Sequence, residues 1–501
     1  MNSEVDPLLR LHPAAMVINA LKSIRRLISA SALPGIFVLF SQGLSPLTIA
    51  LVLLGAGVLV VLAALWGFLS WRATTYGVVG GSFRLRQGVF QKSERTIPLE
   101  HVQSVDTVQG IVQRAFGVYE VRVETAGGGT SEPDASLPAL GRGATEALRR
   151  GIEGSRRVPV GAEEEASGPE ILRRLSTRDL LVAGATSGQI GIALSLLAVG
   201  SQVFDEFFSE AFFRNLVESL APNALILALI LTPAVALFAW LLAIAGTVLA
   251  HFGFTLSRDG EFLYIKRGLL ERREATIPLG RIQAVRVSEG LLRQPFGLAS
   301  LRVESAGYGE DAGVSAVMFP LLPRGEVQAL LRRAAPEFAV APPLNPLPRR
   351  ALRRYVFRST VPALFLAAAG TLIPLLVFDV AFGLPALLLV PLFALYGWLR
   401  FRDAGWALEG DRLVVRSRSL ARVTAVAPRR RLQSRSIFQS PFQRRLRLAS
   451  FGTEVASGVG GSALEVEDIG FDDARRLVEA LSARVPFRAG REDAGGEKRP
   501  A

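Results

Sequence analysis

The sequence contains no cysteine, and its three histidines (His12, His101 and His251) are far apart. The chain therefore has no disulfide bond, no thiolate metal site and no cysteine nucleophile. We also find no phosphate-binding loop, no metal-ligand spacing and no nucleophile motif. The sequence accordingly predicts no catalytic residue, no metal site and no cofactor, and it favours a protein that is not an enzyme.

Charged residues are missing altogether from Leu27 to Trp71. This run is too long for one membrane helix, which needs about 20 residues, and the segment from Gln42 to Pro46 interrupts it. It therefore predicts a transmembrane helical hairpin. Uncharged segments also come in pairs at 180–204 with 219–257 and at 359–378 with 380–399. They predict two more hairpins, which makes about six transmembrane helices in all.

Positive residues are scarce in the loops between the two arms of each hairpin. Loop 41–47 has none, loop 205–218 has Arg214 among four acidic residues, and loop 379–385 has only Asp379. Arginines flank the opposite ends of the hairpins, and the chain has a formal charge of +13. Because positive residues collect on the cytoplasmic side of a membrane, both termini and all segments between hairpins are predicted to be cytoplasmic. We expect a multi-pass protein of the plasma (inner) membrane.

One stretch of about forty residues occurs three times between and after these hairpins, which indicates duplication. Its landmarks in the first copy return 180 residues later, and a more divergent third copy lies 150 residues further on. The recurring residues are Gly88, Pro98, Gln103, Gly117 and Glu124, then Gly268, Pro278, Gln283, Gly297 and Glu304, then Pro428, Gln433 and Glu454.

Within each copy the hydrophobic pattern has a period of two. Phe83 and Leu85 alternate with Arg84 and Arg86, as expected of half-buried strands. Glycine clusters separate the runs, and a helical pattern follows them. Each copy is thus predicted to be a module of several short antiparallel strands closed by one helix.

In the predicted strands after the hairpin, three motifs follow one another: R-x-G-[LV], T-I-P-L-x-x-[IV]-Q-x-V and F-G-L-x-x-[LV]-R-V-E-[ST]-A-G. This arrangement resembles the bacterial pleckstrin-homology-like (PH-like), membrane-flanked family of the YdbS/YdbT type. The resemblance covers almost the whole chain, three times. It implies a seven-stranded, strongly bent sheet capped by a C-terminal helix in each module, and it implies little chemistry. The third copy departs from the motifs at Ser419-Leu420, at Ala427-Pro428-Arg429 and at Arg447.

The predicted fold class is a polytopic α-helical membrane protein with three cytoplasmic PH-like β modules, each a bent antiparallel sheet plus a C-terminal helix. The predicted segments are a cytoplasmic basic leader (1–26), hairpin 1 (27–71), module 1 (74–152), a linker (153–179), hairpin 2 (180–250), module 2 (251–338), a Pro/Arg linker (339–358), hairpin 3 (359–399), module 3 (402–486) and a disordered tail (487–501).

The recurring residues are interpreted as structural. Proline suits the first residue of a strand or an edge, and glycine after phenylalanine suits a tight turn. The glutamines would bond loop backbone or line a peptide groove. The glutamates recur without a second carboxylate or histidine beside them, so exposed or ion-paired positions are favoured over catalysis.

Acidic residues are missing between Asp411 and Glu454, where the third module has eleven arginines. Near an anionic surface each basic residue contributes about 1 kcal/mol, so this segment predicts contact with anionic lipid headgroups. A merely solvated face and an acidic protein partner are the alternatives. The candidate lipid- or partner-binding residues are Arg429, Arg430, Arg431, Arg435, Arg444, Arg445 and Arg447.

The function that these observations favour is a non-enzymatic membrane scaffold whose modules bind anionic lipid headgroups, protein partners or both. The alternative is a transport or export accessory protein with a permease-like character, which would need ionisable residues inside its spans. The six predicted spans contain none. Expected partners are membrane lipid and a membrane protein or a second copy of the chain; no nucleic acid is expected.

Overall fold

The computed structural model describes residues 8–26, 45–125, 135–154, 169–187, 224–305, 317–378, 381–456 and 462–482. The chain divides into two compact units: residues 1–281 with 306–315, and residues 282–305 with 316–501. Module 2 contributes to both units, since its first four strands lie in unit 1 and its last three in unit 2.

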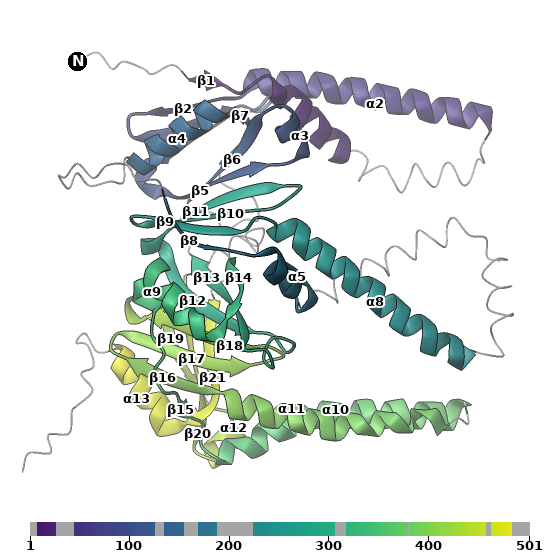
Figure 1. Ribbon diagram of the computed structural model, residues 1–501, viewed down its shortest axis with the longest axis vertical. Coiled ribbons are helices and arrows are strands. Elements are labelled where there is room, and N and C mark those ends of the chain that lie inside the picture. Colours follow the sequence, from purple (N-terminus) through teal and green to yellow (C-terminus); the bar gives the residue numbers. More distant parts are fainter. Residues whose placement is uncertain are drawn as a thin grey trace, which may run out of the picture. The chain divides into compact units, whose positions relative to one another are not determined.

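Three described helices are long and apolar enough to cross a membrane: α2 (Pro46–Ala73), α8 (Ala224–His251) and α10 (Arg350–Phe378). The prediction of six spans in three hairpins is therefore confirmed only as far as three candidate spans. The first arm of hairpin 1 (27–41) and most of the first arm of hairpin 2 lie outside the described residues. In hairpin 3, α11 (Leu389–Asp403) follows the 3-10 helix η7 (Ala381–Leu388) and runs beside α10 (Figure 1). α5 (Thr177–Ala185) similarly lies beside α8 in unit 1.

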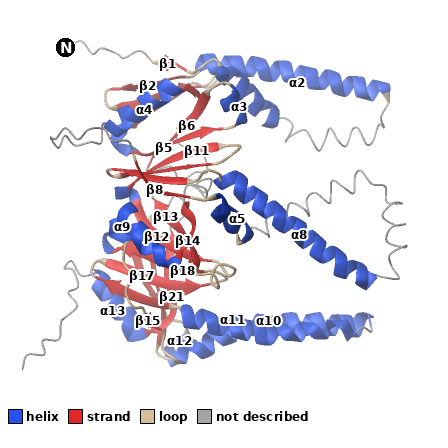
Figure 2. Cartoon of the chain, in the orientation of Figure 1, coloured by secondary structure: helices blue, strands red, loops and turns tan. Residues whose placement is uncertain are grey.

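Unit 1 contains two antiparallel sheets (Figure 2). The first has the order β1-β2-β3-β4 and the second β7-β6-β5-β11-β10-β9-β8. The strands are β1 (Leu9–Arg10), β2 (Thr75–Val79), β3 (Ser82–Gln87), β4 (Ser93–Pro98), β5 (Val102–Gln109), β6 (Val118–Thr125), β7 (Ala135–Gly141), β8 (Glu170–Arg174), β9 (Thr255–Asp259), β10 (Phe262–Arg267) and β11 (Arg272–Pro278).

Unit 2 contains an equivalent seven-stranded sheet, in the order β14-β13-β12-β18-β17-β16-β15, and a three-stranded sheet, β19-β20-β21. The strands are β12 (Ile282–Glu289), β13 (Leu298–Ser305), β14 (Val317–Pro323), β15 (Asn345–Pro346), β16 (Gly405–Glu409), β17 (Arg412–Arg418), β18 (Arg422–Pro428), β19 (Leu432–Phe438), β20 (Leu448–Val455) and β21 (Ser462–Gly470).

Each module thus contributes seven described strands, and the prediction of three PH-like β-sheet modules is confirmed. One detail needs correction, because no module forms a single sheet. The last three strands of one module pair with the first four strands of the next, through β5 with β11 and through β12 with β18. An isolated module would therefore lose half of a sheet.

The leader and both linkers hold structure that the sequence did not indicate. β1, β8 and β15 pair with β2, β9 and β16, so the first strand of every module precedes the membrane hairpin and the other six follow it. Residues 14–26 are helical, and Trp71 of α2 donates to the carbonyl of Leu11 at 2.9 Å.

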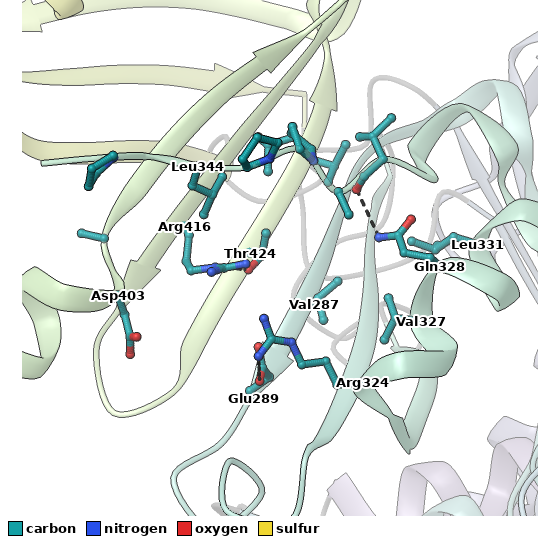
Figure 3. A pocket seen from close by; sticks show the side chains of 18 of the residues that line it. Val287, Glu289, Arg324, Val327, Gln328, Leu331, Leu344, Asp403, Arg416 and Thr424 are labelled. Carbon is teal, nitrogen blue, oxygen red and sulfur yellow. Dashed lines mark hydrogen bonds and ion pairs between the residues drawn. The ribbon is translucent and has the colours of Figure 1, made fainter.

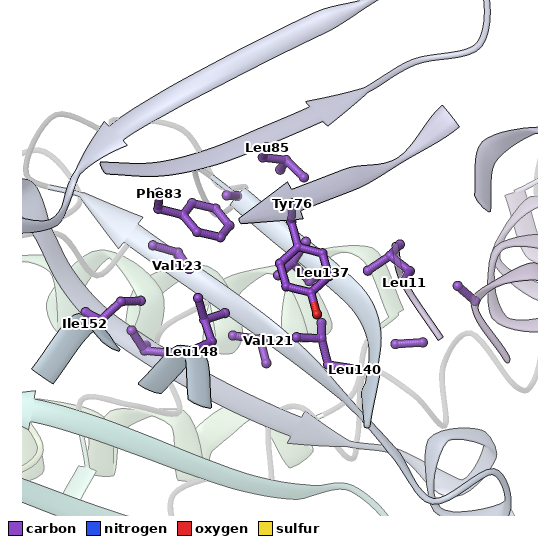
Figure 4. Packing of buried hydrophobic residues seen from close by; sticks show 14 of the residues in the cluster. Leu11, Tyr76, Phe83, Leu85, Val121, Val123, Leu137, Leu140, Leu148 and Ile152 are labelled. Atoms are coloured by element: carbon purple, nitrogen blue, oxygen red, sulfur yellow. The ribbon is translucent and has the colours of Figure 1, made fainter. Parts of the chain in front are cut away.

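The core of module 1 lies between its two groups of strands (Figure 4). Phe83 and Leu85 are fully buried, as the alternation predicted, and they pack with Val121 and Leu137 from β6 and β7. Burying a side chain of this size stabilises the fold by about 1.5–3 kcal/mol. α4 (Arg142–Gly154), α9 (Val327–Ala334) and α13 (Phe471–Ser482) follow the last strands of the three modules.

Candidate membrane-facing loops and an arginine-lined pocket

The turn between the third and fourth strands of each module lies against a helix of the preceding hairpin. In module 1 the ring of Phe90 lies 5.9 Å from the ring of Trp66 on α2. In module 2 the backbone N–H of Leu269 donates to the carbonyl of Leu249 on α8 at 3.0 Å. In module 3 Arg400 of α11 donates to the carbonyl of Arg418, the last residue of β17 before the turn, at 3.1 Å. Each turn therefore lies at the end of its strand pair that is closer to the helices of the hairpin.

An apolar side chain is exposed at the same position of each turn. Phe90 is 89% exposed, Leu270 48% and Leu420 71%. They correspond to one another by the spacings of 180 and 150 residues that relate the modules. An apolar side chain is therefore exposed at the same place in all three modules, next to α2, α8 or α11. We refer to Phe90, Leu270 and Leu420 as the turn residues.

The loop between the fifth and sixth strands of each module also exposes apolar side chains. In module 1 it contains α3 (Ile111–Ala115), and Ile111 and Phe116 are exposed. Arg114 on α3 donates to the carbonyl of Leu269 at 2.7 Å. This loop of module 1 therefore lies beside the turn of module 2, within unit 1.

In module 3 the corresponding loop contains α12 (Pro441–Arg445). Phe442 is 66% exposed, and Arg444, Arg445 and Arg447 are exposed on the same loop. Arg350, in the first turn of α10, donates to the carbonyl of Arg447 at 3.1 Å. The α12 loop thus combines apolar and cationic side chains next to the start of a membrane helix, a combination suited to an anionic bilayer surface.

The seven arginines predicted as a binding site do not form one patch. Arg429, Arg430 and Arg431 form the 3-10 turn η8 after β18. Arg429 donates to the carbonyl of Leu481 at the end of α13, and Arg430 pairs with Glu337 at 2.7 Å.

β19 separates this turn from the α12 loop. It has seven residues, which span about 20 Å at the usual rise per residue. Arg435 lies in the middle of β19 and is exposed. Of the predicted set, the structure therefore brings Arg444, Arg445 and Arg447 together, and it places Arg429–Arg431 at the other end of the strand. Sequence position alone could not reveal this division.

A pocket of about 510 Å³ in unit 2 contains charged residues that the sequence did not single out (Figure 3). Its apolar lining includes Val287, Val327 and Leu331, and its polar lining includes three arginines and two acids. These charged residues are Arg324, Arg402 and Arg416 with Glu289 and Asp403. The pocket is therefore net positive and partly apolar, which suits an anionic group that carries an apolar part.

Glu289 is the most buried charged residue that lines this pocket, and its side chain is 3% exposed. Arg422 forms a bidentate interaction with it, and this hydrogen-bonded pairing raises the pKa of Arg422 despite burial. Burial lowers the pKa of Arg416, and the neighbouring Arg422 and Arg324 lower it further. An anion bound beside Arg416 would relieve this repulsion between cations.

Unit 1 has a corresponding pocket of about 390 Å³, lined by Gln109, Lys266 and Arg267 among others. Gln109 occupies the place of Glu289, so this pocket lacks the buried acid. Burial, with the nearby Arg273, lowers the pKa of Arg267 to about 10. One sequence signal could have revealed both pockets, namely the arginine that begins β11 and β18. Arg272 lies opposite Gln109 in unit 1, and Arg422 lies opposite Glu289 in unit 2.

The recurring prolines end strands rather than begin them, and Pro98 lies on β4, the last strand of its sheet, which fits the alternative of an edge position. Pro98, Pro278 and Pro428 are the last residues of β4, β11 and β18, and a 3-10 turn follows each. Proline fits there because the strand needs no further N–H donor.

The recurring glutamines all lie at a register shift. The pairing skips Gln103, Gln283 and Gln433 between the residues on either side of them, so each module has a bulge at this point. The hydrogen-bonding or groove-lining role of their side chains stays a prediction.

Glu304 and Glu454 each interact with a residue of the neighbouring strand. Glu304 pairs with Arg286 at 2.8 Å, and Glu454 accepts a hydrogen bond from Ser434 at 3.2 Å. Glu124 lies opposite Ser104, at the position equivalent to Glu454 opposite Ser434.

The glycines explain a second set of turns. Gly88 and Gly268 have φ of 112° and 104°, and a Cβ there would lie 1.9 Å from a carbonyl oxygen. Gly117 and Gly297 have φ of 64° and 62°. Arg447 replaces the glycine in module 3 and still adopts φ of 49°, so this turn keeps its conformation without glycine.

Comparisons with known proteins agree with this architecture. A family model described as "Bacterial PH domain" matches residues 28–156, 213–337 and 361–485. The chain is 31% identical over 489 residues to "UPF0699 transmembrane protein YdbT" of Bacillus subtilis (strain 168), covering 94% of this chain and 98% of that protein. No solved structure matches the chain significantly.

Proposed function

The chain belongs to the bacterial PH domain family as a transmembrane protein with three PH-like modules, and from this premise we propose that it is a non-enzymatic scaffold of the plasma membrane. In this proposal its hairpins supply six spans, both termini and all three modules are cytoplasmic, and the modules hold anionic lipid of the inner leaflet. The charge asymmetry of the hairpin loops supports the orientation.

The observation that carries the proposal is the repetition of the turn residues. Phe90, Leu270 and Leu420 are exposed at one equivalent position, and each turn, or the strand residue before it, contacts a helix of its hairpin. In water such side chains would remain solvated at a cost of about 1.5–3 kcal/mol each relative to burial. At the bilayer interface their rings and branched side chains would be buried, while neighbouring arginines meet the headgroups.

Arginines complete the proposed contact. Arg444, Arg445 and Arg447 are exposed on the same loop as Phe442. The pocket with Arg324, Arg402 and Arg416 offers a second place for an anionic headgroup in unit 2, and its wall includes the end of α11. Both features favour anionic over zwitterionic lipid.

The absence of native cysteine makes the proposal easy to test. A single cysteine at Leu420 would carry an environment-sensitive fluorophore in the full-length protein, reconstituted into bilayers that contain doxyl-labelled lipid. Asp411 provides the matched control, because it precedes β17 whereas Leu420 follows it, so the two positions are about 20 Å apart along one strand. We expect quenching at position 420 and little at 411. Equal quenching at both positions, or at neither, would refute the bilayer contact.

The orientation has its own test. An impermeant maleimide should label a cysteine at Gly383, between the arms of hairpin 3, in intact cells. It should label one at Asp411 only after lysis. Labelling of position 411 in intact cells would reverse the proposed topology.

A further inference from the structure

Modules within the chain are joined by one repeated strand pairing. β11 pairs antiparallel with β5, and Arg272 lies opposite Gln109. β18 pairs antiparallel with β12, and Arg422 lies opposite Glu289. Adding 150 to Arg272 gives Arg422, and adding 180 to Gln109 gives Glu289, so the two junctions have the same register.

Two strands, β4 and β19, do not form this inter-module pairing within the described part of the chain. β4 is the module 1 equivalent of β11 and β18, and it is the last strand of a sheet that ends β3-β4. β19 is the module 3 equivalent of β5 and β12, and it is the first strand of its sheet. One chain thus presents one strand of each type at a sheet edge.

We propose that β19 of one chain pairs with β4 of a second copy, in the register that joins modules within the chain. By equivalence Ser93 would lie opposite Phe438, Glu94 opposite Ile437 and Thr96 opposite Arg435. The two surfaces differ, so the contact is heterologous and adds copies until a ring closes. The partner is a second copy because each chain offers both edges and the contact continues a pairing seen twice inside it.

Exposure of the edge strands supports this assignment. Thr276 is 5% exposed in β11, whereas its equivalent Thr96 in β4 is exposed. Ile437 is 36% and Phe438 67% exposed in β19, whereas Val287, the equivalent of Ile437, is 9% exposed. An uncovered edge with large apolar side chains is a template for another strand.

Charged residues on β4 do not argue against pairing. Glu94 on β4, and Lys92 just before it, would protect a solvent-exposed edge. Yet β11 carries Arg272 and Glu274 at the same positions and is fully paired there. In the proposed register Glu94 also lies diagonally across from Arg435 on the same face, and opposite charges at this spacing attract.

Gln439, directly after β19, makes the same hydrogen bond that Gln109 makes at the end of β5. Gln109 donates to the carbonyl of Val118 at 3.2 Å, and Gln439 donates to the carbonyl of Leu448 at 2.8 Å. These two pairs are equivalent in the repeat. The end of β19 is therefore shaped like the end of β5, to which β11 binds.

Disulfide crosslinking between two differently tagged full-length chains tests the pairing. One chain would carry Ser93→Cys and the other Phe438→Cys, co-expressed in membranes and treated with a mild oxidant. We expect a band that contains both tags. The matched control is Ser93→Cys with Ile437→Cys, because a shift of one residue places the side chains on opposite faces and should remove the band.

A second measurement examines assembly without crosslinking. The wild-type chain in mild detergent should have the mass of an oligomer, and Phe438→Lys should reduce it toward one chain. Because Phe438 is exposed, thermal unfolding of the variant should remain cooperative. An unchanged oligomer mass in Phe438→Lys would overturn the proposal.

Three further results would also overturn it. They are no mixed-tag band in the matched register, a crosslink within a single chain that carries both cysteines, and crosslinking of Phe438→Cys only to a different protein. The test does not depend on lipid contact, because the turn residues lie outside both edge strands.

Discussion

Arg354 on α10 donates to Asp468 on β21 at 3.0 Å, and the aspartate side chain is fully buried. Gln443 donates to the same carboxylate oxygen at 2.8 Å. Nearby, Glu467 pairs with Arg358 and Arg400, which belong to α10 and α11. Module 3 is therefore fixed to its membrane hairpin by ion pairs, in addition to the chain connection.

We predict that Arg354→Ala destabilises unit 2 by up to about 3 kcal/mol, because it removes the nearer of the two cations that pair with a buried carboxylate and leaves only Arg358, at 3.8 Å. Thermal or denaturant unfolding of the full chain in detergent would measure the loss. Arg353→Ala is the control, since Arg353 is exposed on the same helix and should change the stability by less than about 0.5 kcal/mol. The double variant Arg354→Ala/Asp468→Asn should recover part of the loss. Equal stability of Arg354→Ala and Arg353→Ala would show that the pair is not structural.

Glu120 gives module 1 a predictable dependence on pH. Burial alone would raise its pKa, but Lys22 at 3.0 Å and Arg122 at 3.1 Å outweigh burial and lower the pKa from its ordinary 4.5. A group whose pKa is lowered by folding stabilises the protein above its unfolded pKa, and this contribution disappears as the pH falls through the folded pKa.

Glu120→Gln should therefore lower the unfolding temperature at pH 7. The difference from the wild type should shrink as the pH falls below about 4.5, the ordinary carboxyl pKa. Unfolding curves of both proteins between neutral and acidic pH would measure this. A difference that is independent of pH would mean that Glu120 acts through packing rather than charge.

Two glycine positions should respond differently to the same substitution. At Gly297 a Cβ meets nothing within 4 Å, so Gly297→Ala costs only the strain of positive φ, about 1–2 kcal/mol. At Gly268 a Cβ would lie 1.9 Å from the carbonyl oxygen of Glu271, so Gly268→Ala should cost more. Arg447→Gly should stabilise unit 2, since it relieves the same strain. Thermal unfolding would rank the three, and a larger loss at Gly297 than at Gly268 would contradict the geometry.

The two groups of arginines at opposite ends of β19 allow a direct comparison of lipid binding. Replacing Arg444, Arg445 and Arg447 with glutamine should lower the amount of anionic lipid that co-purifies with the full chain. Replacing Arg429, Arg430 and Arg431 should leave it nearly unchanged, because Arg429 and Arg430 already bond Leu481 and Glu337 at the other end of β19. Quantitative lipid mass spectrometry would measure both variants.

Salt provides the control for that experiment. Exposed charges are screened over roughly 8 Å at physiological ionic strength, so the lipid difference between wild type and the α12-loop variant should fall as salt rises. If the η8 variant loses more lipid than the α12-loop variant, the assignment of the membrane-facing end is wrong. If neither loses lipid, the arginines serve an acidic protein partner or are simply solvated.

Local pattern was sufficient for the apolar helices and for the strands that follow each hairpin, but it missed β1, β8, β15 and the helix at 14–26. The uncharged runs identified α2, α8 and α10, and the alternation around Phe83 and Leu85 identified β3, because hydrophobic periodicity depends only on which side of an element is buried. The repeat spacing also placed equivalent residues correctly, as the shared bulge at Gln283 and Gln433 shows.

Sheet partners were decided only by the tertiary structure. Alternation reveals which face of a strand is buried, but backbone N–H and C=O groups are the same in every residue and do not specify a neighbour. Since all three modules carry the same pattern, the sequence could not show that β5, which pairs with β6 of its own module, pairs on its other edge with β11 of the next. For the same reason it could not show that β1 and β8 belong to the sheets, or that Arg429 and Arg444 lie at opposite ends of β19. The sequence by itself determined the apolar helices, the strands after each hairpin and their repetition. Three-dimensional packing decided which strand edges meet, and it brought β1, β8 and β15 into the sheets.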